Sequence, residues 1–231
     1  MTPPTTHPLA RRALAEFVGT AFLVTAVIGS GIAAVRLSPN DTGLELLENA
    51  VVTGAALVAL ILALQPVSAA FNPIVTLVER ALGIVSGTEV IALIAAQFAG
   101  GIAGAVLANL MFDLDAVSIA QRSRSGHGLW LAEVIATIGL LIVIFGTVRS
   151  GRTERVAFAV GGYILAAYWF TASTSFANPA VTVARMFSDT FAGIAPASAV
   201  GFVAAQLIGG VLGYLLVRAL YPTASAIEPL E

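Results

Sequence analysis

Long apolar stretches alternate with short polar ones along most of this chain. Six stretches of about 20 apolar residues are long enough to cross a bilayer as helices. Their predicted ranges are 13–35, 47–66, 90–112, 129–148, 156–174 and 197–220. Two shorter apolar pieces, 72–80 and 178–187, begin with Asn-Pro and carry charge after two turns. The pattern therefore predicts six transmembrane helices and two re-entrant half-helices.

The apolar pieces occur twice in the same order. "LAEFVGTAFLV" in the first span matches "LAEVIATIGLL" in the fourth, and "AQFAGGIAGAVLANLMF" in the third matches "AQLIGGVLGYLLVRALY" in the sixth. Each copy contains three spans, an odd number, so the second copy must be inverted in the membrane. This plan places functional sites near the midplane, at the repeat interface. We expect 1–231 to form one all-α transmembrane domain with inverted repeats at approximately 10–112 and 127–221.

The composition favours a membrane protein. Of the 231 residues, 58% are hydrophobic and 10% are charged, whereas about a quarter of a soluble domain is charged. The formal net charge of −2 predicts no nucleic-acid partner, and the absence of cysteine excludes thiol chemistry. The spans contain no Ser-His pair, metal-ligand cluster or aspartate pair, so we expect neither an enzyme nor a cofactor or metal site.

Arginines are distributed unequally between the two predicted sides of the membrane. The side that carries both termini has Arg11, Arg12, Arg149, Arg152, Arg155 and Arg218. The loop after the first span is acidic, although Arg122 and Arg124 also lie on that side. The positive-inside rule predicts a multi-pass protein of the inner membrane with both termini in the cytoplasm.

Each Asn-Pro pair is suited to begin a helix, because Asn is a preferred N-cap residue and Pro suits the first helical position. Irregular backbone at membrane depth is tolerated only when it is buried in protein or lines a watery cavity. Two symmetric copies should therefore bring two helix N-termini together, each with roughly +0.5 of an elementary charge. Such a centre repels cations, while the amides of Asn72 and Asn178 can donate hydrogen bonds to a neutral hydroxylated solute.

These paired boxes inside an inverted six-span repeat resemble the aquaporin and aquaglyceroporin family. The second box, starting at Asn178 and Pro179, reads Asn-Pro-Ala; the first, starting at Asn72 and Pro73, departs at its third residue, Ile74. The resemblance covers approximately 10–221. It implies the aquaporin fold, Asn72 and Asn178 at the pore centre, and a homotetramer in the lipid bilayer with one pore per subunit.

Two glutamates lie at equivalent places in the first and fourth spans. A carboxylate inside a span is costly and is a functional candidate by default. The resemblance implies that Glu16 and Glu133 brace the half-helix loops; the alternative places them at the membrane interface, near Arg11 and Arg12.

The family usually has a four-position filter on the outer side of the boxes. Its arginine, three residues after the second Asn, is replaced here by Val181. Arg185 lies one helical turn further outward, about 6 Å away, where it lines the outer mouth or is a solvated helix end.

The other filter positions follow from the same resemblance. The second span supplies Thr53, with Val52 as the alternative, and the loop before the second box supplies Ser175. The fifth span supplies Tyr168, chosen from the neighbouring candidates Ala166, Ala167 and Tyr168.

A filter without the usual aromatic, histidine and arginine should be wider and less polar. "SFANPAVTVAR" together with a Thr in the second span is similar to bacterial aquaporin-like channels associated with arsenic resistance. The predicted function is passive passage of small neutral solutes: glycerol-like polyols, metalloid hydroxides such as arsenite, methylated arsenicals and water. A water-selective aquaporin and an anion-permeable channel are the alternatives.

Overall fold

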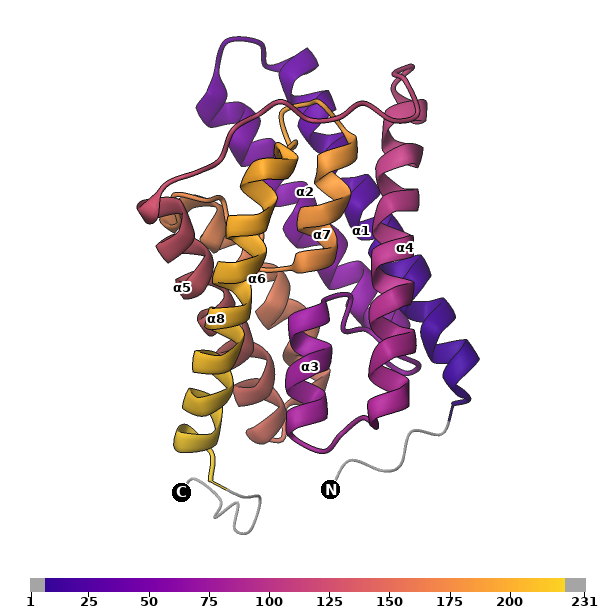
Figure 1. Ribbon diagram of the computed structural model, residues 1–231, viewed down its shortest axis with the longest axis vertical. Helices are drawn as coiled ribbons and strands as arrows, with labels where there is room; N and C mark the ends of the chain where they lie inside the picture. Colours follow the sequence, from indigo (N-terminus) through magenta and orange to yellow (C-terminus); the bar gives the residue numbers. More distant parts are fainter. Residues whose placement is uncertain (1–6, 223–231) are drawn as a thin grey trace.

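The computed structural model describes residues 7–222, and this part of the chain is built from helices without a strand (Figure 1). The predictions for the extreme ends of the chain concern residues outside this range. The helices are α1 (Leu9–Leu37), α2 (Thr42–Leu64), α3 (Pro73–Ala81), α4 (Gly87–Met111), α5 (His127–Arg149), α6 (Val156–Phe170), α7 (Pro179–Ala184) and α8 (Pro196–Leu220), with 3₁₀ turns η1 (Thr153–Arg155) and η2 (Arg185–Phe187).

The predicted plan of six spans and two half-helices is confirmed, with one span shorter than expected. Five helices, α1, α2, α4, α5 and α8, are long and apolar enough to cross a membrane. The sixth, α6, ends at Phe170 instead of near residue 174. It ends there because the backbone of Thr171 is extended, with φ −111° and ψ 133°. The backbone that follows is therefore free to form the loop before α7.

The two halves pack in matching ways. Helix α1 packs against α2 and α4, and α5 packs in the same manner against α6 and α8. The halves meet where α2 contacts α6, where α7 contacts α4, and where α3 contacts α8. In Figure 1 the half-helices α3 and α7 lie one above the other along the long axis, between α8 on one side and α4 on the other. This arrangement is the inverted repeat that the sequence predicts.

Glycines allow the closest helix crossings in both halves. A Cβ atom at Gly100 or Gly104 would lie 2.2 Å from a backbone carbonyl oxygen of α1, that of Phe17 or Ala21 respectively. In the second half, a Cβ at Gly209 would lie 2.7 Å from the carbonyl oxygen of Val134 on α5. Only a residue without a side chain permits these approaches, as is usual for crossing helices in membranes.

Candidate functional site

Asn72 and Asn178 cap the two half-helices, and each reaches the loop of the other. The amide nitrogen of Asn72 donates to the carbonyl of Ala177 at 2.8 Å, and that of Asn178 donates to the carbonyl of Phe71 at 2.7 Å. Each side-chain oxygen accepts from the first turn of its own half-helix, which begins in both cases with a proline, Pro73 and Pro179. A primary amide has two N–H donors, so each asparagine keeps one for a molecule between them.

The loops before both asparagines are in an unfavourable backbone conformation. Phe71 and Ala177, directly before Asn72 and Asn178, have φ angles of 48° and 47°. Such left-handed conformations cost roughly 1–3 kcal/mol each in residues other than glycine and persist only where the surroundings fix them. The loops therefore need firm bracing from neighbouring helices.

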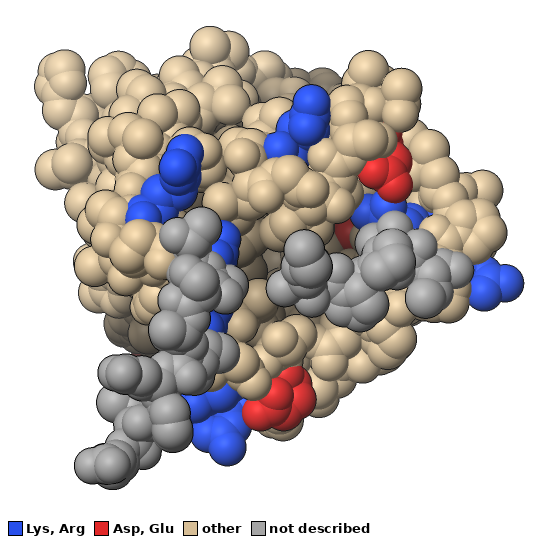
Figure 2. All heavy atoms as spheres, turned by 90° about the horizontal axis from the view of Figure 1, so that it is seen from below, with Lys and Arg blue, Asp and Glu red and all other residues tan. Residues whose placement is uncertain are grey.

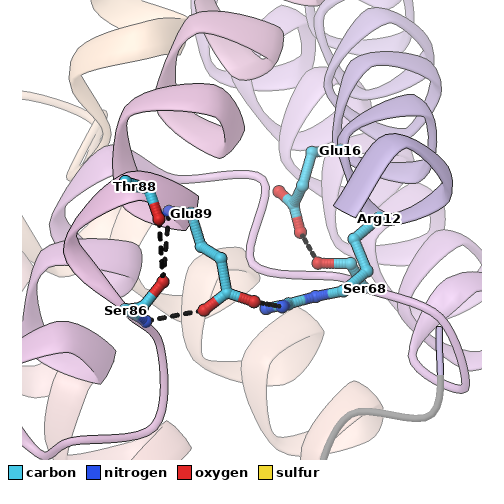
Figure 3. Close-up of polar contacts among 6 residues, drawn as sticks. All are labelled: Arg12, Glu16, Ser68, Ser86, Thr88 and Glu89. Carbon is cyan, nitrogen blue, oxygen red and sulfur yellow. Dashed lines mark hydrogen bonds and ion pairs between the residues drawn. The ribbon is translucent and has the colours of Figure 1, made fainter. Parts of the chain in front are cut away.

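Glu16 of α1 braces the first loop from a fully buried position. Its carboxylate accepts hydrogen bonds from the backbone N–H groups of Ala70 and Phe71 at 2.8 and 2.7 Å. The Ser68 hydroxyl donates to it at 2.6 Å, a contact drawn in Figure 3, and the Gln97 amide of α4 donates at 2.8 Å. Four donors thus converge on one carboxylate and fix the loop that presents Asn72.

Glu133 of α5 repeats this arrangement for the second loop. It accepts from the backbone N–H groups of Phe176 and Ala177 at 2.9 and 2.8 Å, and from the Gln206 amide of α8 at 2.6 Å. Glu133 is also fully buried. Neither glutamate lies at a solvated interface, so the bracing role implied by the resemblance agrees with the geometry of both.

The glutamines that complete these networks were missed in the sequence. Gln97 and Gln206 are fully buried, and each also donates to a half-helix threonine at 2.9 Å, Thr76 and Thr182 respectively. Their signal was available: both matched strings begin with Ala-Gln, so each repeat places a polar residue at the same point of an otherwise apolar span.

A cavity of about 890 Å³ runs along the repeat interface past both asparagines. Its wall includes Glu79 and Arg12 near the end of the molecule where α1 begins, and Tyr168, Ser175 and Arg185 toward the other end. Between them the wall is mainly aliphatic, with Leu23, Val27, Leu57, Val75, Leu140, Ile144, Val160 and Ile164. A solute in this passage meets few hydrogen-bonding groups apart from the two loops and their asparagines.

All four predicted filter residues lie in the wall of this cavity. The hydroxyls of Thr53 and Tyr168 are 3.2 Å apart and hydrogen-bond across the two halves. Val52 is 42% exposed and lies outside the wall, which favours Thr53 at this position. Ser175 is buried, and its hydroxyl has no partner among the described residues.

Tyr168, rather than Ala166 or Ala167, contributes to the wall from α6. Its aromatic neighbours Trp169 and Phe170 are 51% and 56% exposed and point away from the passage. Tyr168 thus supplies an aromatic ring and a hydroxyl near the outer end, at the position chosen for it from the sequence.

Arg185 is buried, so the interpretation as a solvated helix end is wrong. Only 2% of it is exposed, and its guanidinium lies 3.5 Å from the ring centroid of Phe176. Its Nε donates to the carbonyl of Ala192, in the loop that returns over the end of α7. This loop encloses the end of the half-helix, where the sequence alone left solvent as an alternative.

An ion pair between α1 and α4 lies beside the end of the cavity at which α1 begins. Arg12 pairs with Glu89 of α4 at 2.5 Å, and Glu89 also accepts from the backbone N–H of Ser86 at 2.6 Å (Figure 3). Ser86 and Glu89 form a capping box at the start of α4. The pair ties the beginnings of α1 and α4 together beside the wall of the cavity.

Comparisons with known proteins agree with this geometry. The model of the family described as Major intrinsic protein matches residues 4–172 and 149–229. The aquaglyceroporin AqpS of Rhizobium meliloti (strain 1021) is 48% identical over 95% of this chain and 94% of its own. Aquaporin AqpM of Methanothermobacter thermautotrophicus is 29% identical over 92% of this chain and 96% of its own. The crystal structure of the aquaglyceroporin from Plasmodium falciparum superposes with a TM-score of 0.73 at 18% identity, over 93% of this chain and 98% of that one.

Proposed function

The chain belongs to the major intrinsic protein family, and we propose that it conducts small neutral solutes through the cavity between its two asparagines. The family is one of channels, and the chain is an integral multi-pass membrane protein. The observation that carries the proposal is the continuous cavity that passes both half-helix N-termini. Asn72 and Asn178 form its centre, where each has a free amide proton for a passing oxygen.

The outer filter in this proposal consists of Thr53, Tyr168, Ser175 and Val181. Three of the four side chains carry a hydroxyl, and Val181 replaces the family's arginine. Such a filter suits a solute with several hydroxyls and one apolar face, because an apolar wall position costs that solute little desolvation. Glycerol-like polyols and the neutral hydroxides of arsenic(III) have this character, and the high identity to a relative called an aquaglyceroporin supports the choice.

Water-selective passage is the weaker candidate function. The absent arginine favours larger solutes, whereas the hydroxyl bond between Thr53 and Tyr168 narrows the outer end. Methylated arsenicals fit the apolar part of the wall and are included among the proposed solutes. The proposal carries no catalytic step.

We also propose that both termini face the cytoplasm of a bacterial cell and that the chain forms a homotetramer. Basic side chains are spread over the described part of the face at which α1 begins and α8 ends, with acidic ones in few places (Figure 2). This distribution is typical of the cytoplasmic side. The tetramer rests on the resemblance to the family.

Stopped-flow light scattering on reconstituted protein tests the proposed function. Vesicles with the protein should shrink and reswell faster than empty vesicles in glycerol and urea, and inward arsenite flux should increase by a similar factor. Faster water flux with solute flux at the level of empty vesicles would contradict the relaxed filter. Flux that varies with an imposed membrane potential would favour the anion-permeable alternative.

A further inference from the structure

A second, smaller cavity lies beside the outer end of the passage. It has a volume of about 90 Å³, and its wall includes the side chains of Arg122, Arg124 and Arg185. Arg122 and Arg124 come from the segment between α4 and α5, and Arg185 follows the second half-helix. Arg185 lies in the walls of both cavities, so the smaller one adjoins the passage.

The three arginines share no acidic partner among the residues that the structure describes. No carboxylate lies in the wall of the smaller cavity, and neither described ion pair involves these three side chains. The acidic groups nearby are engaged elsewhere: Asp41 caps α2, and Asp189 accepts from the backbone N–H of Gln121. Three positive charges therefore line one small space whose wall holds no carboxylate, and the buried Glu133, outside that wall, is the acidic group whose charge favours Arg124 and Arg185.

Backbone carbonyls take up only some of the guanidinium donors. Arg122 donates to Phe191, Arg124 donates to Phe191 and Gly193, and the Nε of Arg185 donates to Ala192. The two terminal nitrogens of Arg185 have no hydrogen-bond partner among the described residues, although the side chain is 98% buried (2% exposed). Because Arg185 lines both cavities, these N–H groups are available to a ligand with acceptor oxygens.

The electrostatics of the neighbouring loop point the same way. Burial, together with the charges of Arg185 and Arg122, lowers the pKa of Arg124 to about 9. Burial is the largest cause of this shift, the two neighbouring arginines add to it, and the charge of Glu133 opposes it. A negative group in the cavity would relieve the mutual repulsion of all three side chains.

We propose that this cavity binds one small oxyanion beside the mouth of the passage. Guanidinium groups present planar pairs of N–H donors that match carboxylate, phosphate and arsenate oxygens and fit chloride poorly. The volume holds a few water molecules or one anion of that size. A soluble anion is the expected ligand, because Arg122 in the cavity wall is exposed on the loop between α4 and α5.

Binding of inorganic phosphate to the purified full-length protein tests this inference. Isothermal titration at constant ionic strength should show saturable binding to the wild type. Arg122→Gln removes an exposed cation from the wall and should weaken that binding about tenfold or more, as expected for a charged hydrogen bond. No conduction measurement is involved, so failure here is distinct from failure of the proposed channel function.

Arg36→Gln is the matched control on the same side of the molecule. Arg36 donates to the carbonyl of Phe112 and lies 5.2 Å from its ring; Arg122 makes the same two contacts with Phe191, at 5.1 Å. Both substitutions remove one exposed charge and one such contact pair, but only Arg122 lies in the cavity wall. The control should bind phosphate like the wild type.

Two results would overturn the inference. One is the absence of saturable phosphate binding to the wild type, and the other is equal weakening by both glutamine variants, which would indicate general charge screening. If Arg122→Gln does not yield folded protein, Arg122→Lys replaces it. The lysine keeps the charge but loses the planar fork, so affinity should fall several-fold; unchanged affinity would contradict binding by guanidinium geometry.

Discussion

We expect Glu133→Leu to destabilise the protein severely. In the fraction of the variant that still folds, the ratio of the fluxes of different solutes should change little. The substitution keeps the approximate size of the side chain and removes its acceptors. Three donors then lose their partner: the N–H groups of Phe176 and Ala177, and one N–H of Gln206. At about 1–3 kcal/mol for each buried donor left unpaired, the cost is roughly 3–9 kcal/mol. Stabilities of about 5–15 kcal/mol are typical of folded domains, so this loss is a large part of the total.

The assay is thermal unfolding of the purified protein in detergent, followed by size-exclusion chromatography after heating. Glu133→Leu should give much lower yield and a clearly lower melting temperature. Glu133→Gln keeps one acceptor oxygen and should fall between leucine and wild type. Glu154→Leu is the control, since Glu154 is exposed and contacts only the neighbouring Arg155. A Glu133→Leu protein that melts like the wild type would refute the bracing role.

The symmetric position gives a further check on the same reasoning. Glu16 accepts from four groups instead of three, the additional one being the Ser68 hydroxyl. That hydroxyl can rotate to another acceptor, whereas the two backbone N–H groups cannot. Glu16→Leu should therefore cost at least as much stability as Glu133→Leu, and a much smaller cost would show that the first loop is held by other contacts.

Three further substitutions test the passage itself. Val181→Arg places a second cation one helical turn from Arg185; it should lower glycerol and arsenite flux more than water flux, and an unchanged flux ratio in stopped-flow measurements would remove Val181 from the filter. Thr53→Phe should act in the same direction through bulk, because Thr53 lies in the wall of the passage beside Tyr168, and the two changes together should be non-additive. Asn178→Asp replaces the amide donor to the Phe71 carbonyl with a carboxylate. It should raise proton or sodium leak, measured in vesicles loaded with a pH-sensitive or a sodium-sensitive dye. No added leak would argue against cation exclusion by the helix ends.

The sequence was sufficient for the arrangement of spans because the arrangement is written twice. Two matched strings and two Asn-Pro boxes fix the order of elements, and an odd number of spans in each copy fixes the inversion. The end of α6 could not be predicted in this way. The stretch "TASTS" after Phe170 is polar enough to form a loop, yet it is also short enough to continue the helix. In the structure the extended backbone of Thr171 ends the helix.

The partners of the two glutamates depend on tertiary structure. Sequence position suggested that Glu16 and Glu133 act alike, but not that a glutamine on a different helix would complete each network. The lengths of α4 and α8 and their crossing with α1 and α5 bring Gln97 and Gln206 to the right depth. Glycines set these crossings, so packing residues without any role of their own in transport still determine where the polar groups meet.

Arg185 shows why the charge of the filter cannot be predicted from the residue at one sequence position. The absence of an arginine at position 181 suggests an end of the passage without a fixed cation, yet the structure places a guanidinium one turn away in the same wall. Helical periodicity locates Arg185 on the correct face but does not say whether that turn is solvated. Two distant contacts decide it, the ring of Phe176 and the carbonyl of Ala192. In the proposed channel, a cation held at this height would keep positive charge at the mouth while Val181 leaves its own position without a long side chain, so size selection and charge selection would be separated along the passage.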